Sequence, residues 1–268
     1  MDQEERHERT QEPGPNDVSI VMAVKDNLEW TRKGIESIRA NTDHRFELIT
    51  VDNGSQPETT EYLAEASDVF IRNDENLGCS AAWNQGIRAS SMPLVCIVNN
   101  DIEVPSGWLG RLVDFLRDND FLMVSPSIRE GPFDYDLDAY NTDFANRLGH
   151  RAFPSELRGI AMLARRDLFD EIGLYDESYK VGGYEDEDMF MTIRSVGGDV
   201  ATTSSVLFHH YGSKTLSVEQ RSNSFDFSAA NRAHFMRKWR HRYFWRKFHR
   251  TRMKWRRASI RRKFDVTY

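Results

Sequence analysis

Clusters of carboxylate and amide side chains follow three short apolar runs of this sequence. The clusters are Lys25-Asp26-Asn27, Asp52-Asn53-Gly54-Ser55 and Asn99-Asn100-Asp101. Carboxylate oxygens are the ligands that Mg²⁺ and Mn²⁺ prefer, and carboxylates also accept hydrogen bonds from nucleotides. The alternative for each cluster taken alone is a turn, because Asp and Asn side chains readily bond to nearby backbone.

Asp101 is the residue of LVCIVNNDIEV (94–104) best suited to hold a divalent cation. Mg²⁺ in proteins typically takes one or two carboxylates together with substrate phosphates. Glu103 lies two residues further on, but the residue between them sits in a turning segment. We therefore expect Glu103 to point away from Asp101 and not to be a direct ligand.

Four consecutive acids, Glu185 to Asp188, precede a predicted helix. One or two acids are enough to cap a helix and to interact with its dipole. The excess indicates that at least one carboxylate serves as a general base. Two histidines, His209 and His210, end a late predicted strand. Neutral imidazole is a good ligand for Mn²⁺, and the alternative for this pair is a structural role.

Strands and helices alternate from residue 18 to about residue 128. The predicted strands span residues 18–24, 46–55, 68–74, 94–101 and 121–128, and the predicted helices lie within 28–42, 57–66, 76–90 and 106–119. This alternation is typical of an α/β fold with a mostly parallel sheet and helices on both faces. Ligands of such sheets bind at the carboxyl ends of the strands, so the three polar clusters should share one edge.

The second half of the chain is less regular. Residues 130–156 are polar and predict a loop over the site, and 158–179 predict a strand, a helix and a turn. A helix is expected from Asp188 to about Ser195, followed by the strand that ends in the two histidines. We expect three regions: a disordered acidic leader (1–17), a main domain (18–225) and a basic, aromatic-rich helical tail (226–268).

The composition limits the class of protein. Apolar residues make up 39% of the chain, and no run approaches the roughly 20 apolar residues that span a bilayer. The N-terminal segment lacks the apolar stretch of a secretory signal. The two cysteines, Cys79 and Cys96, do not suggest a disulfide framework. We therefore expect a cytoplasmic protein, either free or peripheral to the inner face of the membrane.

The tail is strongly basic. Residues 231–268 contain 15 Lys and Arg and one acid, and so carry +14; because the whole chain carries −6, the remainder carries −20. Phe235, Trp239 and Tyr243 fall on one face of a helix. Residues 231–264 suit an anionic membrane surface, as a basic amphipathic helix does. They also suit nucleic acid, through arginine and stacking aromatics. The third interpretation is a helix docked on the acidic body.

The order of the segments resembles the family 2 glycosyltransferases, which have the GT-A fold, and within them the rhamnosyltransferase-like subgroup. The resemblance covers residues 18 to about 215. The matching segments are VSIVMAVKDN, FELITVDNGS, NLGCSAAWNQGI, LVCIVNNDIEV, RGIAMLARRDLFDEIGLYDE, YEDEDM and FHHYGSKT. Each segment taken alone is weak evidence for this family, whereas seven segments in the right order are specific to it. Ala23-Val24-Lys25 departs from the Pro-Thr-Tyr of many members, which leaves the donor contact there open.

The resemblance implies an inverting, hexosyltransferase-type enzyme that uses Mn²⁺ or Mg²⁺. Its donor would be a nucleotide-diphosphate sugar, UDP- or dTDP-linked, and its acceptor a hydroxyl group, such as that of a lipid-linked glycan. Asp186 would be the base, with Glu185 as second candidate, and Asp101 and His209 would hold the metal. The implied donor-binding residues are Asp26, Asp52, Asn53, Asn76, Gly78, Asn84 and Asn100. The implied acceptor contacts are Asp188 and Trp108.

Three alternatives stay open. One is a glycosyltransferase that modifies DNA and holds it through the basic tail. Another is an inactive GT-A-like protein that binds nucleic acid or membrane, against which the set of Asp101, Asp186 and His209 argues. The last is a sugar nucleotidyltransferase, but KDNLEW (25–30) is not the Gly-rich phosphate loop that such enzymes carry.

Overall fold

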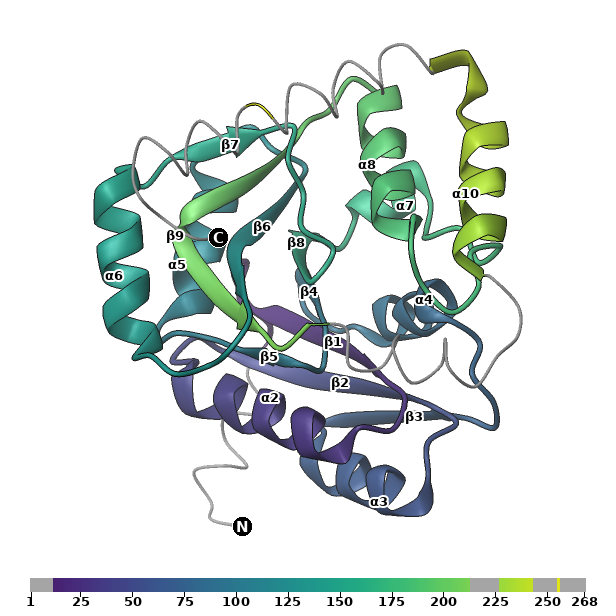
Figure 1. Ribbon diagram of the computed structural model, residues 1–268, viewed down its shortest axis with the longest axis horizontal. Coiled ribbons are helices and arrows are strands. Elements are labelled where there is room, and N and C mark those ends of the chain that lie inside the picture. Colours follow the sequence, from purple (N-terminus) through teal and green to yellow (C-terminus); the bar gives the residue numbers. More distant parts are fainter. Residues whose placement is uncertain (1–11, 213–226, 243–254, 256–268) are drawn as a thin grey trace.

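The structure is a computed structural model that describes residues 12–212, 227–242 and 255. The described chain forms a sheet with strand order β3-β2-β1-β4-β8-β6-β9-β5, and β7 pairs with β9 (Figure 1). The strands are β1 (Val18–Val24), β2 (Phe46–Asn53), β3 (Val69–Asn73), β4 (Leu94–Val98), β5 (Ile102–Glu103), β6 (Met123–Glu130), β7 (Ala152–Pro154), β8 (Ala161–Arg165) and β9 (Val200–His210). The helices are α2 (Leu28–Asn41), α3 (Pro57–Ala66), α4 (Cys79–Ala89), α5 (Trp108–Arg117), α6 (Leu137–Leu148), α7 (Leu168–Ile172), α8 (Glu185–Ser195), α10 (Phe227–Lys238) and the 3₁₀ turn η1 (Arg240–Arg242).

The first four predicted strands form the parallel half of the sheet. β1 pairs with both β2 and β4, and β2 pairs with β3, all in parallel. Val24 lies opposite Asp52, and Met22 lies opposite Val98. The three polar clusters therefore follow neighbouring strands at one edge of the sheet, as the alternation of strands and helices predicts.

The other half of the sheet is mixed. β8 lies between β4 and β6 and is antiparallel to both, whereas β6 and β9 are parallel. The short strand β5 is antiparallel to β9. The prediction of a parallel sheet thus holds from β3 to β4, and beyond β4 the late strands β8 and β9 set the topology. Their directions depend on long connections, which local patterns do not encode.

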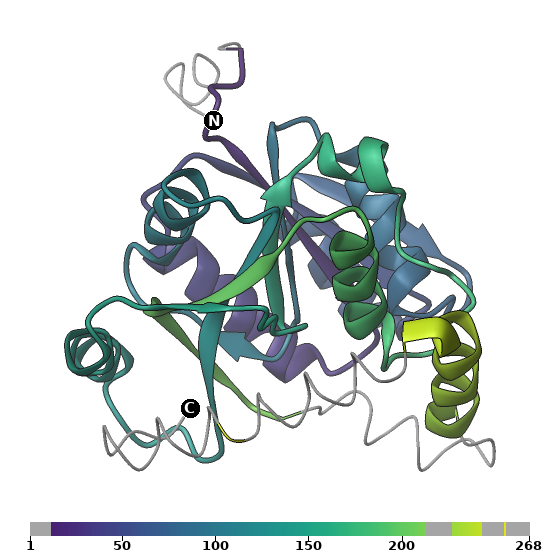
Figure 2. The same cartoon turned by 90° about the horizontal axis from the view of Figure 1, so that it is seen from above.

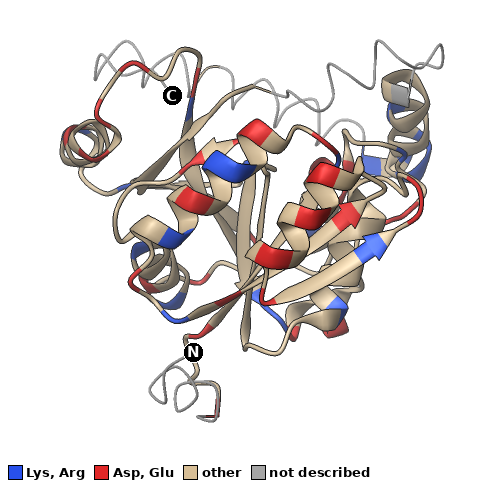
Figure 3. Cartoon of the chain, turned by 90° about the horizontal axis from the view of Figure 1, so that it is seen from below, with Lys and Arg blue, Asp and Glu red and all other residues tan. Residues whose placement is uncertain are grey.

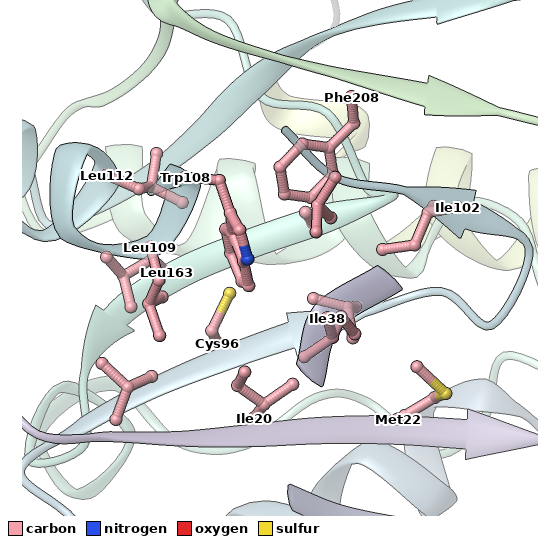
Figure 4. Packing of buried hydrophobic residues seen from close by; sticks show 14 of the residues in the cluster. Ile20, Met22, Ile38, Cys96, Ile102, Trp108, Leu109, Leu112, Leu163 and Phe208 are labelled. Atoms are coloured by element: carbon pink, nitrogen blue, oxygen red, sulfur yellow. The ribbon is translucent and has the colours of Figure 1, made fainter. Parts of the chain in front are cut away.

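Helices cover both faces of the sheet because β1 and its neighbours are apolar on both sides. On one face, Ile20 and Met22 pack with residues of α2, α3 and α5, and Figure 4 shows part of this cluster. On the other face, Val21 packs with residues of α4, α7, α8 and α10. The sheet is therefore a buried platform, and only its edges are left for a site.

Residues 130–156 are not the loop that their polarity predicts, because they contain α6 and β7. The Asp136 side chain accepts a hydrogen bond from the Ala139 amide and caps the N-terminus of α6. Phe144 and Leu148 pack against Leu207 of β9. The prediction was wrong because the apolar positions of this helix are few and lie between many polar residues.

The N-terminal region is ordered at its described end. Asp17 is 8% exposed and forms an ion pair with Arg45, with 3.1 Å between Oδ2 and Nη1. The predicted disordered leader therefore does not extend to residue 17, and its residues 1–11 lie outside the described chain.

The beginning of the predicted tail is α10, which packs beside α8 on the body of the protein (Figures 1 and 2). Asn231 and Phe235 of α10 are 2% and 0% exposed. Figure 3 shows basic residues on this helix and acidic residues distributed over the body. The face of Phe235 and Trp239 is thus used for docking on the protein itself. Residues 243–254 and 256–268 lie outside the described chain, and so does the predicted position of Tyr243.

The described helices include none that is both long and apolar enough to cross a bilayer.

Candidate functional site

Asp26 lies in the turn that follows β1, and this turn is hydrogen-bonded to the segment that follows β2. Asp26 Oδ1 accepts a hydrogen bond from the Gln56 amide (2.7 Å), and the Asp26 amide donates to Ser55 Oγ (2.8 Å). Asp26 and Asn27 have φ values of 54° and 57°. Such left-handed backbone outside glycine costs about 1 kcal/mol or more and is concentrated at functional sites. The Asp26 side chain is 36% exposed, so it is accessible to a ligand.

Asp52 and Asn100 are buried near this edge of the sheet. Asp52 is fully buried, and its carboxylate accepts hydrogen bonds from the Ser55 amide (2.8 Å) and from Thr60 Oγ1 (2.6 Å). The prediction that Asp52 contacts the donor is therefore wrong, since both of its oxygens are used inside the protein. Asn100 is 6% exposed, and its Nδ2 donates to Thr31 Oγ1 (2.8 Å).

The amides assigned to the donor from the NLG segment hold loops together. Asn53 Nδ2 lies 3.0 Å from Asn76 Oδ1 and 3.2 Å from the carbonyl oxygen of Gly78. Asn84 is 1% exposed and exchanges two 2.9 Å hydrogen bonds with the backbone of Tyr175. The donor assignments of Asn53 and Asn84 are therefore wrong, because the polar groups of both side chains are buried and used for the fold. Asn76, at the surface, stays a prediction, as does the backbone of Gly78.

Asp101 and His210 are brought together by the antiparallel pairing of β5 with β9. Ile102 lies opposite His210 in this pairing. His210 Nε2 lies 3.2 Å from Asp101 Oδ1, and the two side chains are 3% and 4% exposed. On the other side of the ring, His210 Nδ1 lies 3.0 Å from Glu130 Oε1 at the end of β6. The imidazole of His210 is thus held between two carboxylates.

This arrangement fits a divalent cation. When His210 Nδ1 carries the proton and donates to Glu130, Nε2 keeps its lone pair. Nε2 is buried and faces the Asp101 carboxylate, 3.2 Å from Oδ1. Burial lowers the pKa of His210, but the hydrogen bonds and charges of Asp101 and Glu130 raise it overall, so the position between the two carboxylates suits a positive charge, either a proton on Nε2 or a metal ion. Metal-ligating histidines usually donate their other N–H to a carboxylate such as Glu130. Asp101 and His210 would hold the metal, and Glu130 would orient His210.

Additional ligands would have to come from a substrate or from water. The described residues hold no group of three or more His, Cys, Asp or Glu with metal-site geometry. Mg²⁺ and Mn²⁺ sites with few protein ligands are normally completed by phosphate oxygens. The donor set therefore suits a cation that binds together with a phosphorylated ligand.

His209 lies on the opposite side of β9. Its Nδ1 is 3.0 Å from the Tyr135 hydroxyl, and its ring stacks on Phe133 with centroids 4.6 Å apart. Burial lowers the pKa of His209 to about 4, so the ring is neutral near pH 7. The assignment of His209 as metal ligand is wrong, because successive side chains of a strand alternate in direction and His210 is the residue that faces Asp101.

Glu103 also points away from the Asp101 carboxylate. It lies opposite His209 in the pairing of β5 with β9, and its Oε1 accepts a hydrogen bond from the Tyr211 hydroxyl (2.9 Å). This is the direction that the sequence predicts for it.

The acidic run forms the first turn of α8, which begins at Glu185, three residues before the predicted start. Burial raises the pKa of Glu185 to about 8, to which the charge of Asp186 contributes. Burial also raises the pKa of Asp186. Glu185 is 9% exposed and its Oε2 is buried without a hydrogen-bond partner, whereas Asp186 is partly exposed. Asp186 is therefore the more exposed of the two carboxylates, and its raised pKa makes it a stronger base than an ordinary aspartate.

Asp186 and Asp101 are linked through the segment Gly159-Ile160. A Cβ atom built on Gly159 would lie 2.5 Å from Asp186 Oδ2, so these residues are in direct contact. The next residue, Ile160, accepts a hydrogen bond from the Asn99 amide (2.9 Å), two positions before Asp101. The candidate base and the candidate metal ligand therefore lie along one edge of the sheet.

We expect Gly159→Ala to reduce the activity of the site strongly without unfolding the protein. The added methyl would also lie 2.9 Å from Asp186 Cβ and Cγ, so the Asp186 side chain must move. A misplacement of about 1 Å at a catalytic group can cost about 10²-fold in rate. Steady-state rates and melting temperatures of the variant measure both effects. Gly110→Ala is the matched control, because its new Cβ would meet only His44 Nδ1, at 3.8 Å. Equal rates for both variants would contradict the placement of Asp186.

Asp188, assigned to the acceptor, is instead the point where α10 docks on α8. Asp188 is 4% exposed, and its Oδ1 accepts hydrogen bonds from Trp239 Nε1 (2.7 Å) and the Tyr179 hydroxyl (3.0 Å). Its Oδ2 lies 2.8 Å from Lys238 Nζ, which also contacts Asp176 Oδ2 at 2.8 Å. The acceptor assignment of Asp188 is wrong, because both of its oxygens are taken by these partners.

Helix α10 also supports the turn that leads into α8. Val181 and Tyr184 have φ values of 60° and 78°. Such strained backbone persists only where the surroundings enforce it. Asn231 supplies such contacts: its Nδ2 lies 2.9–3.2 Å from the carbonyl oxygens of residues 180, 182 and 183. Helix α10, the first described part of the tail, therefore stabilises the backbone of the turn that precedes the acidic run.

Lys238→Met should destabilise the protein by about 2 kcal/mol. Breaking a buried ion pair costs 3–5 kcal/mol, and the partial exposure of Lys238 reduces this cost. Burial alone would raise the pKa of Asp176, but hydrogen bonds from Lys238 and His234 lower it overall. Urea denaturation measures the loss. Arg232→Met, at an exposed position of the same helix, is the control. Equal unfolding midpoints for both variants would show that the Lys238 contacts do not hold α10.

Trp108, the other residue assigned to the acceptor, is a core residue. It is fully buried in α5, its Nε1 donates to Thr42 Oγ1 (2.8 Å), and its ring meets Phe208 edge-on at 5.1 Å (Figure 4). The acceptor assignment is wrong because Trp108 starts the apolar face of α5, and that face packs on the sheet.

Sequence reasoning missed three residues of this region. Alternation along a strand shows that only one of the two adjacent histidines can face a given neighbour, but it does not show that His210 is that one. Glu130 carries no local signal, since its role depends on the pairing of β6 with β9. Lys238 could not be distinguished from the many other basic residues of the tail by sequence alone.

The chain resembles known proteins in sequence and in fold. The model of a family described as Glycosyl transferase family 2 matches residues 19–178. The chain is 24% identical over 212 residues to the pre-mycofactocin glycosyltransferase of Mycobacterium tuberculosis, which covers 74% of this chain and 43% of the relative. It is 27% identical over 197 residues to the succinoglycan biosynthesis protein ExoU of Rhizobium meliloti, covering 66% and 56%. The chain thus spans about half the length of these relatives.

The fold has solved counterparts. The crystal structure of GalNAc-T7 with UDP, GalNAc and Mn²⁺ superimposes with a TM-score of 0.63 at 16% identity, over 82% of this chain and 47% of that one. This likeness establishes the GT-A fold. Because the family match covers more than half of the sequence, the chain belongs to glycosyl transferase family 2.

Proposed function

We propose that this protein transfers a sugar from a nucleotide-diphosphate donor to a hydroxyl acceptor, with inversion at the anomeric carbon. The donor nucleotide would be UDP or dTDP. The observation that carries the proposal is the buried pair of Asp101 and His210, linked to Asp186 through the contact of Asp186 with Gly159 and the hydrogen bond of the Asn99 amide to Ile160. The edge thus offers an accessible base and a pair of metal ligands.

In this mechanism Asp186 accepts the proton of the acceptor hydroxyl. The acceptor oxygen forms its bond to the anomeric carbon from one side while the bond to the diphosphate oxygen breaks on the other, so the configuration inverts. The transition state resembles the oxocarbenium species of glycoside hydrolysis. The raised pKa of Asp186 makes it a stronger base than an exposed aspartate.

Asp101 and His210 would hold Mn²⁺ or Mg²⁺ next to the donor diphosphate. Bound there, the cation would stabilise the negative charge of the leaving group. A related fold crystallised with UDP, GalNAc and Mn²⁺ supports this combination of ligands. Asp26, Asn76 and Asn100 remain the predicted donor contacts, and Glu185 remains the second candidate for the base.

The test is a screen of UDP- and dTDP-sugars with Mn²⁺, read by thermal shift and by release of the nucleoside diphosphate. We expect at least one donor to raise the melting temperature and to be hydrolysed slowly, and EDTA to abolish both effects. A protein that binds none of these donors, or that hydrolyses them equally well in EDTA, would contradict the proposed metal-dependent transfer. Binding without turnover would favour an inactive GT-A-like binding protein.

A further inference from the structure

A cavity of about 700 Å³ opens on the far side of β5 from the core and is not used by the mechanism above. Its lining comes from Trp30 and Lys33 of α2, Glu103 of β5, the turn 131–133 and Tyr211. This volume lies in the range of small-molecule sites, which are about 300–1,000 Å³. Segments that are far apart in the sequence therefore build one concave surface.

Three aromatic rings form the walls. The Trp30 and Tyr211 rings are 4.3 Å apart with an interplanar angle of 44°, and Phe133 meets Tyr211 edge-on at 5.9 Å. Phe133 is 39% exposed, which is unusual for a large apolar side chain. The partly negative faces of aromatic rings attract weakly positive C–H groups, such as those on the flat face of a pyranose.

The polar groups of the cavity favour an uncharged ligand. Glu103 accepts a hydrogen bond from the Tyr211 hydroxyl (2.9 Å). Lys33 Nζ lies 4.4 Å from the centre of the Trp30 ring and is bonded to Glu29 (2.8 Å). The lining itself holds one carboxylate, Glu103, and one ammonium, Lys33, so it carries no net charge that would attract a phosphate or a nucleotide. Carboxylate and ammonium groups both pair well with the hydroxyls of a neutral sugar.

The cavity lies next to the candidate metal site, because two of its lining residues are close in sequence to Asp101 and His210. Glu103 lies two residues after Asp101, and the Tyr211 amide, one residue after His210, donates to the Asp101 carbonyl oxygen (3.0 Å). A ligand in the cavity is therefore next to the place where a donor diphosphate would bind, but it contacts a different set of side chains.

We propose that this cavity binds a sugar ring of a neutral oligosaccharide acceptor, stacked on Trp30 and hydrogen-bonded to Glu103. The assignment rests on the proposed function, because it makes the acceptor a carbohydrate. It predicts that the protein binds oligosaccharides in the absence of donor and metal, through residues that do not take part in the proton transfer.

The test is binding of the full chain to an array of neutral oligosaccharides in EDTA, followed by saturation-transfer NMR with the best binder. We expect Trp30→Ala to weaken binding at least about 10-fold, since stacking on an aromatic ring is lost. Glu103→Gln keeps the shape and removes the charge, and should weaken binding by a smaller factor. Tyr62→Ala is the matched control, because Tyr62 lies under Arg32 at 4.1 Å in a similar cation–aromatic pair outside the cavity.

Two outcomes would overturn the proposal: no array binding by the wild-type protein, or equal binding by wild type and Trp30→Ala when both melt at the same temperature. If Trp30→Ala does not fold, the proposal is tested instead by the oligosaccharide affinity of Glu103→Gln and by the ligand contacts that saturation-transfer NMR detects. Donor hydrolysis with Mn²⁺ is measured in parallel and should be unchanged in Trp30→Ala. Loss of hydrolysis in the wild type with intact glycan binding would reject the proposed transfer and leave the carbohydrate site standing.

Discussion

Replacing Asp186 with asparagine should lower the rate of sugar transfer by about 10²–10⁴-fold and leave nucleotide binding intact. This is the usual contribution of a general base, and asparagine keeps the shape of the side chain but cannot take a proton. The hydrogen bond from the Glu187 amide to Asp186 Oδ1 (2.8 Å) can still form with the asparagine carbonyl. Acceptor-dependent release of nucleoside diphosphate measures the rate, and calorimetry with the same nucleotide measures binding.

The pH profile gives a second check on the same residue. Burial raises the pKa of Asp186, and Glu185 beside it has a pKa of about 8, so both carboxyls hold their protons at higher pH than exposed acids do. A base works only when deprotonated, so activity should rise as the pH rises through the apparent pKa of this pair. The small residual activity of Asp186→Asn should lack this rise.

Two variants of neighbouring acids make the result specific. Glu187→Gln alters an acid of the same turn and should keep nearly wild-type turnover. Glu185→Gln tests the second candidate. Normal turnover in Asp186→Asn together with a collapse in Glu185→Gln would move the role of base to Glu185.

Replacing His210 with alanine should abolish stimulation by Mn²⁺, whereas His209→Phe should preserve it. His210 Nε2 faces Asp101, while His209 is packed between Phe133 and Tyr135, where phenylalanine keeps most of the contacts. We expect a loss of at least about 10²-fold in transfer for His210→Ala. Electron paramagnetic resonance of Mn²⁺ titrated into each protein measures binding directly and does not depend on turnover.

The variant Glu130→Gln refines this prediction. Glu130 accepts from His210 Nδ1 at 3.0 Å, and partners of this kind typically contribute 10–100-fold to metal affinity. The Mn²⁺ affinity of Glu130→Gln should therefore fall between those of the wild type and His210→Ala. Loss of Mn²⁺ binding in His209→Phe, with normal binding in His210→Ala, would show that His209 and not His210 is the metal ligand.

Local patterns in the sequence were enough to predict the parallel half of the sheet. The alternation of β-branched runs with amphipathic segments identifies β1 to β4 and their helices, because each segment carries its own apolar period. The same alternation predicts that Asp26 and Asp101 lie at the same edge of the sheet. The acidic run before α8 was recognised as a candidate base because it contains more acids than capping requires.

Side-chain direction and burial were decided by the tertiary structure. Trp108 and Asp188 have the residue types of ligand contacts, yet one packs in the core and the other binds α10. Nothing in the sequence around Asp52 shows that Ser55 and Thr60 use both of its oxygens. These contacts join residues that are brought together only by folding.

The two histidines show most clearly which features follow from the sequence and which are decided by the tertiary structure. The sequence determined that an imidazole ends β9 near the polar edge, since the strand and its length follow from local pattern. Which of the two rings faces Asp101 depends on the pairing of β9 with β5, where Ile102 lies opposite His210. A shift of one residue in that pairing would exchange the two histidines, because side chains alternate along a strand. Register is set by contacts between distant segments, so only the folded protein determines it.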